Sequence, residues 1–472
     1  MIQVVNMIPR SNSNESEQDS EPHITVNPTN PRQVAASAFT PDPLGGPNAP
    51  IYVSNNGGLT WTLNPIVPSG AGQQFPTGDI TTAAPGRRTD DDDDDDDDES
   101  NGRLYAGILR TPGFPFNALR TPDKDSSTVM TELQSRPNED QPWTQVVKVR
   151  SGSDAGKDRL YIGINDFNAR PRSATVEQSL DAAIGAPAFT SVRIEKRATS
   201  GQNGPQIRPV VHRDGTVYAA FYGWRNFDNS TNRVTADVVV VRDDNGGAGA
   251  SPYEALQDAS DGIAGVRMVR GITFTFSSNV FGPFLGQERL GGHLSIAVDP
   301  RNSSTVYLAY ADQQTAGYTL HIHRSTDRGQ TWGSDLRTIA NAINPALAVN
   351  SRGHVGLLYQ RLTGTAPNQR WETHLERSSN GGATWGDSVL ATTPAATPLR
   401  QGVPYLGDYA YLMAVGRTFY GIFSANNSPN RANFPSGVRY QRNVDFATNR
   451  LLGLDGSTII RTSIDPFFVK SS

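Results

Sequence analysis

The chain has 472 residues, among them 45 glycines, 32 prolines and no cysteine, and a formal net charge of −5. The absence of cysteine excludes disulfides, thiolate metal sites and cysteine nucleophiles. The many glycines and prolines, with 36% hydrophobic residues, favour short strands joined by turns over long helices.

Residues 1–22 form an N-terminal segment with a short apolar stretch at residues 2–5. The segment lacks a basic region followed by a long apolar stretch, so no signal peptide is visible, and export by another route would leave the same pattern. The chain also has no apolar run of about 18 residues, and we therefore expect no membrane span.

Pairs of alternating apolar stretches on either side of a polar turn recur along the rest of the chain and indicate β-hairpins. Regular copies cover residues 24–39, 208–222, 294–310, 346–360 and 410–423. With two less regular copies, they predict seven four-stranded sheets that begin near residues 23, 78, 158, 206, 293, 344 and 408. Six sheets are the alternative, because the third copy is poorly marked.

The pattern S-x-[D/N]-x-G-x-T-W occurs three times, at residues 54–61, 325–332 and 378–385. Its Asp or Asn side chain can bond backbone amides, its Gly can adopt a positive φ, and its Trp can pack beneath the turn. An eroded copy follows Arg242 at residues 243–247. A turn repeated at this spacing indicates a repeat architecture.

These turns are similar to Asp-boxes, and the chain resembles the sialidase-type BNR-repeat β-propeller families. The resemblance implies an all-β propeller of seven four-stranded blades over residues 23–472, with the boxes as structural turns remote from any active site. The N-terminal segment, or the apolar residues 459–460 and 467–469, could complete the last blade and remove exposed edges. Sialidases, some glucanases, sorting receptors and photosynthetic assembly factors share such boxes, so the fold does not determine the function.

An acidic run, Asp90–Asp98 followed by Glu99, lies in the expected second blade. Without these ten acidic residues the chain would carry +5 instead of −5. Such a run cannot be buried, and we expect residues 86–101 to form a solvated surface insertion on the face that carries the boxes. Weak binding of divalent cations is the alternative role.

The opposite face of such a propeller carries the loops into the first strands and those between second and third strands. A ring of charged and aromatic residues is expected there, including Glu21, His23 and Asn344. Sugar sites need this mixture, because aromatic faces stack on sugar rings and charged side chains bind hydroxyls and carboxylates. The candidate substrate-binding residues are Arg208, Arg225, Arg400, His293, Asp79 and Trp224.

The resemblance also implies catalytic residues, since sialidases use a Tyr nucleophile activated by a Glu, an Asp acid/base and three arginines. The segment Gly407-Asp408-Tyr409 resembles one in BNR-repeat proteins, and Asp408, Tyr409 and Glu288 are the catalytic candidates. They would act as a carboxylate pair or as a Tyr409–Glu288 couple. The family's Arg-Ile-Pro motif is not matched, because the nearest segment is Ile8-Pro9-Arg10.

Several functions therefore stay open for a carbohydrate-engaging propeller. A sialidase-like glycoside hydrolase is the first hypothesis, and a polysaccharide lyase that uses His293, Tyr409 and Arg208 is a related one. A non-catalytic lectin and a structural or assembly module with a protein partner are the alternatives. No nucleotide, zinc or nucleic-acid motif is present, so we expect no cofactor, metal or nucleic acid. By resemblance, the location is extracellular or at the cell surface.

Overall fold

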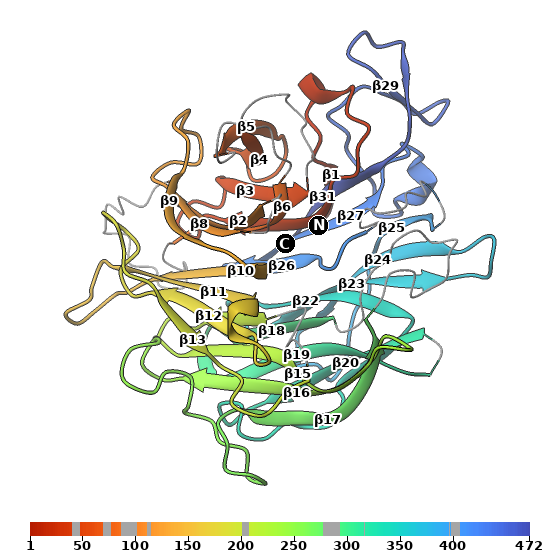
Figure 1. Ribbon diagram of the computed structural model, residues 1–472. Helices are drawn as coiled ribbons and strands as arrows, with labels where there is room; N and C mark the ends of the chain where they lie inside the picture. Colours follow the sequence, from red (N-terminus) through yellow and green to blue (C-terminus); the bar gives the residue numbers. More distant parts are fainter. Residues whose placement is uncertain are drawn as a thin grey trace.

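The computed structural model describes residues 1–39, 48–68, 77–85, 102–110, 115–200, 207–276, 293–315, 317–395, 397 and 406–472 (Figure 1). These residues form β-strands and the short 3-10 helices η1 (Arg10–Asn12), η2 (Phe167–Ala169) and η4 (Arg431–Asn433). The all-β expectation is confirmed. The described ranges contain no helix that could span a membrane.

The strands are organised in antiparallel sheets of four, taken here in chain order as blades one to seven. Blade one contains β2 (Ser20–Val26), β3 (Val34–Phe39), β4 (Ala49–Ser54) and β5 (Thr62–Val67). Blade two contains β6 (Thr77–Ala83), β7 (Leu104–Arg110), β8 (Phe116–Thr121) and β9 (Thr131–Arg136). Blade three contains β10 (Glu139–Lys148), β11 (Asp158–Asp166), β12 (Ala174–Ser179) and β13 (Thr190–Arg193). Blade four contains β14 (Ile207–Val211), β15 (Val217–Asp228), β16 (Arg233–Asp243) and β17 (Val266–Thr275). Blade five contains β18 (Leu294–Asp299), β19 (Asn302–Thr315), β20 (Gly317–Ser325) and β21 (Arg337–Ala340). Blade six contains β22 (Ala342–Val349), β23 (Val355–Thr363), β24 (Arg370–Ser378) and β25 (Val389–Pro394). Blade seven contains β26 (Tyr411–Val415), β27 (Thr418–Asn426), β31 (Ile464–Ser471) and β1 (Ile2–Asn6).

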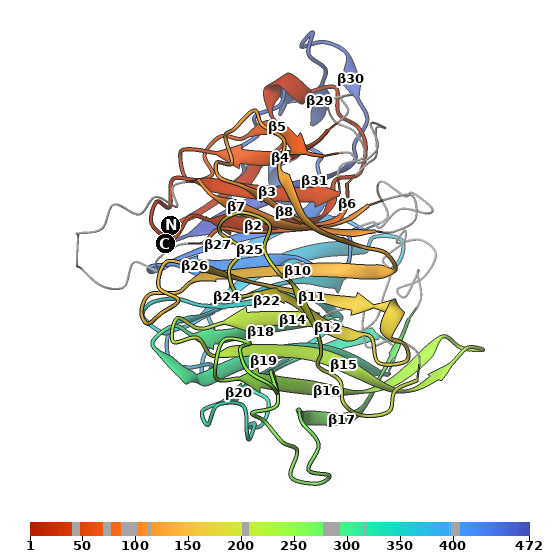
Figure 2. The same cartoon turned by 60° about the vertical axis from the view of Figure 1, so that its left-hand side comes forward.

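The first strands of successive sheets contact one another in a closed cycle. The order is β2, β6, β10, β14, β18, β22, β26 and again β2, and Figures 1 and 2 show these strands in the middle of the molecule. A closed cycle of four-stranded sheets around their first strands is the β-propeller fold that the hairpin repeat predicts. The described residues contribute seven such sheets, and one further three-stranded sheet of β28 (Val444–Asp445), β29 (Arg450–Leu452) and β30 (Ile459–Ile460).

The last blade contains strands from both ends of the chain. β1 pairs with β31 from Ile2↔Ser471 to Asn6↔Phe467, and β31 pairs with β27. The two termini lie side by side (Figures 1 and 2), and the Met1 amino group donates to Ser472 O at 3.0 Å. The residues 459–460 that were an alternative for this closure lie instead in the three-stranded sheet.

The hydrophobic core lies between neighbouring blades. The run Val238–Val241 in β16 is fully buried. Val238 and Val240 belong to one apolar cluster with side chains of blade five, whereas Val239 and Val241 belong to another with side chains of blade three. Because successive side chains of a strand point to opposite faces, a blade covered on both faces needs a continuous apolar run.

The first strand of the third blade was placed wrongly by the hairpin repeat, which put its start near residue 158. That segment is the second strand, β11, and the first strand is β10, which begins at Glu139. β10 opens with Glu139, Asp140 and Gln141, so its start lacks apolar alternation. The other six blades begin within three residues of the expected positions.

The three S-x-[D/N]-x-G-x-T-W turns each join the third strand of a blade to the fourth and share one set of hydrogen bonds. The Ser hydroxyl accepts from the Gly amide, the Asp or Asn oxygen accepts from the Thr amide, and the Trp Nε1 donates to the Gly carbonyl at 3.0–3.1 Å. Trp61 is 2% exposed, but Trp332 and Trp385 are only partly buried. The expected turn geometry is therefore present, with unequal burial of the Trp.

The acidic insertion, residues 86–101, lies outside the described residues. In the chain it connects β6 to β7, the first and second strands of the second blade. Its position on the surface stays a prediction.

Candidate functional site

Three first strands open with a β-bulge that contains a non-glycine residue of positive φ. These residues are Glu21 (54°), Gln141 (57°) and Asn344 (52°), and the strand register shifts across each of them. Such a backbone conformation is rare outside glycine, and bulges re-aim side chains at functional sites. All three side chains are buried at the inner ends of their blades.

We call the buried polar and aromatic residues at these strand starts the axial cluster. Every member is at most 6% exposed. The members are Glu21, His23, Asp79, Gln141, Trp143, Arg208, His293, Asn344, Asp408 and Tyr409.

Asp408 connects four blades at the centre of the cluster. Its Oδ2 accepts from Gln141 Nε2 at 2.6 Å, and its backbone amide donates to Glu21 Oε1 at 3.1 Å. Its carbonyl oxygen lies 3.3 Å from His293 Nδ1. Because these partners come from blades three, one and five, the predicted Gly-Asp-Tyr segment is held by the closed ring.

Tyr409 faces Asp79, with 3.4 Å between its hydroxyl and Asp79 Oδ1. Its ring lies edge-on to Trp143, at 5.4 Å between centroids. Burial, followed by the charges of Asp79 and Glu21, raises the pKa of Tyr409 well above its usual 10. Tyr409 is therefore a neutral hydroxyl that donates to the Asp79 carboxylate.

Arg208 stacks on Trp143, with 3.5 Å between its guanidinium carbon and the ring centroid. This is a buried cation–π contact. Neither Nη1 nor Nη2 has a hydrogen-bond partner among the described residues. Burial lowers the pKa of Arg208 to about 9, and the nearby Tyr409, Asp79, Asp408 and Glu21 oppose this effect. The guanidinium is thus charged at neutral pH, but within the described part of the chain its two Nη atoms lack the hydrogen bonds that a buried charge requires.

His23 is held in a neutral form between two aromatic rings. It stacks on Tyr411 at 3.9 Å and meets Trp143 edge-on at 4.9 Å. Its Nδ1 accepts from the Thr82 amide at 3.2 Å, so the proton lies on Nε2. Burial, and next the charge of Arg208, lowers the pKa of His23 well below 6.5.

The described part of the axial cluster is closely packed. A cavity lined by Trp143, Arg208, Asn344, Asp408 and Tyr409 has a volume of about 10 Å³, which is room for about one water molecule. The chain segments that lead into the first strands of blades two, four, five and seven fall partly outside the described residues.

The structure brings five of the nine candidate site residues together: Asp79, Arg208, His293, Asp408 and Tyr409. Arg225 instead pairs with Glu195 at 3.1 Å and Asp237 at 2.8 Å. Trp224 packs among phenylalanine side chains, 5.3 Å from the Phe227 ring and 5.1 Å from the Phe276 ring. Both lie near the far end of β15, where a bulge between residues 224 and 226 shifts the register. Glu288 and Arg400 lie outside the described residues.

Gln141 and Trp143 are members of the cluster that sequence reasoning missed. Both belong to β10, the strand that was not recognised as a first strand. The available signal was the polar segment Asn138–Gln141 followed by Pro142 and Trp143, shortly before the β-branched pair Val146 and Val147.

A second group of carboxylates, Glu139, Asp166 and Glu177, lies in the third blade. Arg136 forms ion pairs with all three, at 2.9 Å to Glu139 and 2.9 Å to Asp166. Burial raises the pKa of Glu139 to about 8. Carboxylate oxygens suit hard cations, but here Arg136 supplies the positive charge.

No family model matches the chain, and no protein of established function matches its sequence. Among solved structures, a GH74 xyloglucanase from Xanthomonas campestris is 13% identical with a TM-score of 0.38, over 84% of this chain and 69% of that one. An alpha-L-arabinanase from Penicillium chrysogenum complexed with arabinobiose is 12% identical with a TM-score of 0.36, over 77% and 89%. Sqt1 from Chaetomium thermophilum is 13% identical with a TM-score of 0.39, over 90% and 82%. Likenesses this distant do not indicate a function, and the sialidase-type resemblance stays a prediction.

Proposed function

We propose that the protein is a carbohydrate-active propeller, a glycoside hydrolase whose active site is the axial cluster. One observation carries the proposal: Nη1 and Nη2 of the buried Arg208 lack hydrogen-bond partners among the described residues, beside Tyr409 and three carboxyl groups. A buried charged group without hydrogen bonds is costly, and a ligand oxygen would supply them.

The charge of the axial cluster suits the chemistry of glycoside cleavage. Glu21, Asp79 and Asp408 bring three carboxyl groups against the single guanidinium of Arg208. The transition state of glycoside hydrolysis is an oxocarbenium-like cation, which carboxylates stabilise. The same excess of negative charge disfavours a polyanionic substrate.

The roles follow from the contacts. Tyr409 is the nucleophile, and Asp79, which it faces at 3.4 Å, accepts its proton as the hydroxyl attacks the anomeric carbon. Asp408, in its protonated form, gives its proton to the leaving oxygen and later, as a carboxylate, removes a proton from the water that cleaves the glycosyl–tyrosine intermediate. Asp79 returns its proton to the Tyr409 oxygen as that bond breaks. Asp79 thus takes the role that the sequence assigned to Glu288.

The substrate class in this proposal is a glycoside with one carboxylate, as in sialosides, bound through Arg208. Sialidases use three arginines for this carboxylate, whereas Arg208 is the one arginine of the axial cluster as the described residues define it. A terminal uronic acid also bears one carboxylate. Hydrolysis assays with sialosides and with uronides distinguish the two kinds of substrate.

A non-catalytic role is the second candidate, and the close packing favours it. Asp408 is 0% and Tyr409 4% exposed, and the cavity beside them holds about one water molecule. In this role the axial cluster joins the blades, and the protein is a lectin or an assembly module.

The test is hydrolysis of fluorogenic sialosides, uronides and neutral glycosides by the wild type and by Asp408→Asn, Tyr409→Phe and Arg208→Lys. Turnover of one class, with a loss of about 10²–10⁴-fold in Asp408→Asn, supports the hydrolase. Tyr359→Phe is the matched control, because Tyr359 also donates to a buried carboxylate, Glu376, but lies outside the cluster. Glycan binding without turnover would leave a lectin, and neither activity would leave the structural role.

A further inference from the structure

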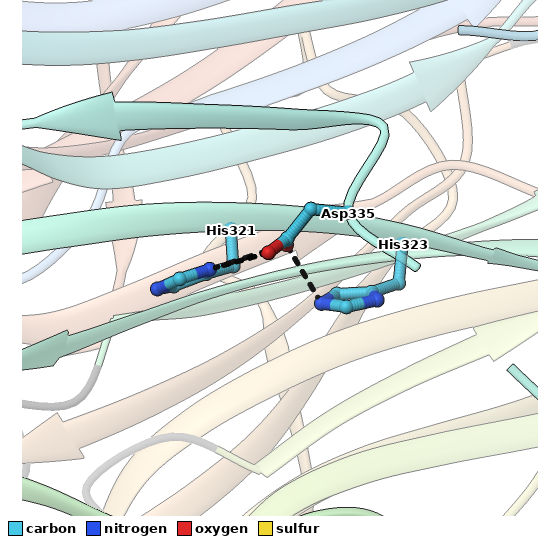
Figure 3. Close-up of side chains that lie close together, drawn as sticks. All are labelled: His321, His323 and Asp335. Carbon is cyan, nitrogen blue, oxygen red and sulfur yellow. Dashed lines mark hydrogen bonds and ion pairs between the residues drawn. The ribbon is translucent and has the colours of Figure 1, made fainter. Parts of the chain in front are cut away.

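Two histidines and an aspartate meet on blade five, away from the axial cluster (Figure 3). His321 and His323 are two residues apart on β20, so their side chains leave the same face of the strand. Asp335 follows the repeated turn and precedes β21. Both Asp335 oxygens lie 3.1 Å from His321 Nδ1, and Oδ1 lies 2.9 Å from His323 Nε2.

The second nitrogen of His323 has a hydrogen-bond partner, whereas that of His321 has none among the described residues. His323 Nδ1 lies 2.8 Å from Gly333 O and therefore carries the proton, which leaves a lone pair on Nε2, the nitrogen beside Asp335. His321 Nε2 lies 3.6 Å from Asp312 Oδ1, and its Nδ1 faces Asp335. Metal-binding histidines have the arrangement seen at His323, in which an outer oxygen fixes the ring and its tautomer.

The contact between His323 and Asp335 is short but is not a hydrogen bond. His323 Nε2 is buried and has no hydrogen-bond partner among the described residues, although a carboxylate oxygen lies 2.9 Å away. An unprotonated nitrogen and a carboxylate oxygen at this distance repel each other, and a cation bound to both would remove the repulsion.

The rings are held in place before any ion arrives. Tyr310 stacks on His321 at 5.0 Å and on His323 at 5.7 Å, with interplanar angles of 11° and 15°. The Asp335 side chain is 36% exposed and that of His321 17%, so an ion can reach the three groups from solvent.

We propose that His321, His323 and Asp335 bind a divalent transition-metal ion of the Zn²⁺ class. Their candidate ligand atoms all lie within 4.8 Å of one another. Two imidazoles and a carboxylate suit Zn²⁺ and its neighbours, whereas Ca²⁺ and Mg²⁺ prefer oxygen ligands. With three protein ligands, one position of a tetrahedral site stays open to water.

The acidic groups that surround His321 favour a cation. Asp335 lies 3.1 Å from His321 Nδ1, and Asp312 Oδ1 lies 3.6 Å from His321 Nε2. These carboxylates would stabilise a bound metal ion. Protons compete for the ligand nitrogens, so metal binding weakens as the pH falls.

Blade six provides a matched control within the same chain. His374 precedes Ser378 by four residues, as His321 precedes Ser325, and its Nδ1 lies 2.9 Å from Asp387. Glu376 stands in the position of His323 and is engaged by the Tyr359 hydroxyl and Arg337. Blade six thus repeats the His–Asp pair without a second imidazole.

The experiment is a Zn²⁺ titration of the full chain by calorimetry, together with X-ray absorption of the zinc-loaded protein. We expect one tight site whose zinc has two imidazole ligands. Loss of a residue that only orients a ligand lowers metal affinity by roughly 10–100-fold. His321→Ala and His323→Ala each remove a direct ligand, so each should lower the zinc affinity by more than this. His374→Ala should leave the affinity unchanged.

Other outcomes overturn the proposal. The wild type could show no tight zinc site, or its zinc could have oxygen ligands alone, as the acidic run at residues 90–98 would supply. His374→Ala could also lose as much zinc affinity as His321→Ala. Circular dichroism checks the fold of each variant. Asp335→Asn, at a more exposed position, supplies the same test if a histidine variant fails to fold, and unchanged affinity in that variant would also refute the site.

Discussion

Gln141 Nε2 donates a 2.6 Å hydrogen bond to Asp408 Oδ2, and the two residues are 267 positions apart in the chain. Asp408 is 0% exposed and Gln141 3%, so the bond replaces water that the carboxylate lost on folding. It joins the third blade to the seventh across the axis. A buried carboxyl oxygen that loses such a donor is left unsatisfied, which costs free energy.

Gln141→Leu should therefore destabilise the protein by about 1–3 kcal/mol, because it leaves Asp408 Oδ2 without this donor. In an Asp408→Asn background the same change should cost less, since a neutral amide is cheaper to leave unpaired. Urea melts of the four proteins measure the difference. Gln145→Leu on the same strand, where Gln145 donates to the Tyr411 hydroxyl at 3.2 Å, is the control. Equal costs for both glutamines would contradict the role of Asp408.

The tryptophans of the repeated turns should differ in their contribution to stability. Trp61 is 2% exposed and contacts Phe468 at 5.4 Å between centroids, whereas Trp332 is only partly buried. Trp61→Ala should cost about 3–5 kcal/mol, as for other buried aromatic truncations, and Trp332→Ala should cost less. Both tryptophans donate the same Nε1 bond to a Gly carbonyl, so equal losses would show that this bond, and not burial, sets the cost.

The fold could be predicted because its signals are local. The repeated turns and the alternating strands each lie within about fifteen residues, and their chemistry does not depend on the rest of the chain. The exception is β10, whose start is polar because Gln141 and Trp143 face the axis instead of a neighbouring blade. A first strand that contributes two residues to the axial cluster thus carried the weakest strand signal.

The candidate site was predictable only in part, because the ring brings together residues from Glu21 to Tyr409. Positions at strand starts identified Asp79, Arg208 and Tyr409, which lie where the topology places them. Arg225 failed to join them because Glu195 and Asp237 neutralise it locally, and ion pairing between strands leaves no periodic signal. The bulges that position Gln141 and Asn344 depend on positive φ values at these residues. A positive φ at a residue other than glycine cannot be predicted from the sequence, because such residues rarely adopt it.

Removal of the acidic run should leave the propeller intact. β6 and β7 pair in antiparallel register up to Ala83↔Tyr105, so a short turn can close this hairpin without residues 86–101. Ten consecutive acidic groups cannot be desolvated together, and the run is therefore expected outside the core. Circular dichroism and thermal melts of the deletion variant test this. An unfolded variant would show that the run is part of the structure.

Glu139 should make the stability of the protein depend on pH. It is 1% exposed, and burial raises its pKa from 4.5 to about 8, with Arg136 acting in the opposite direction. Between these two values the folded state binds a proton that the unfolded state has lost, so this residue makes stability fall as the pH rises. Glu139→Gln removes this effect. The variant should gain stability relative to the wild type between about pH 5 and about pH 8, measured by urea melts across that range. A difference that does not change with pH, or that shrinks as the pH rises, would show that Arg136 keeps Glu139 ionised in the folded protein.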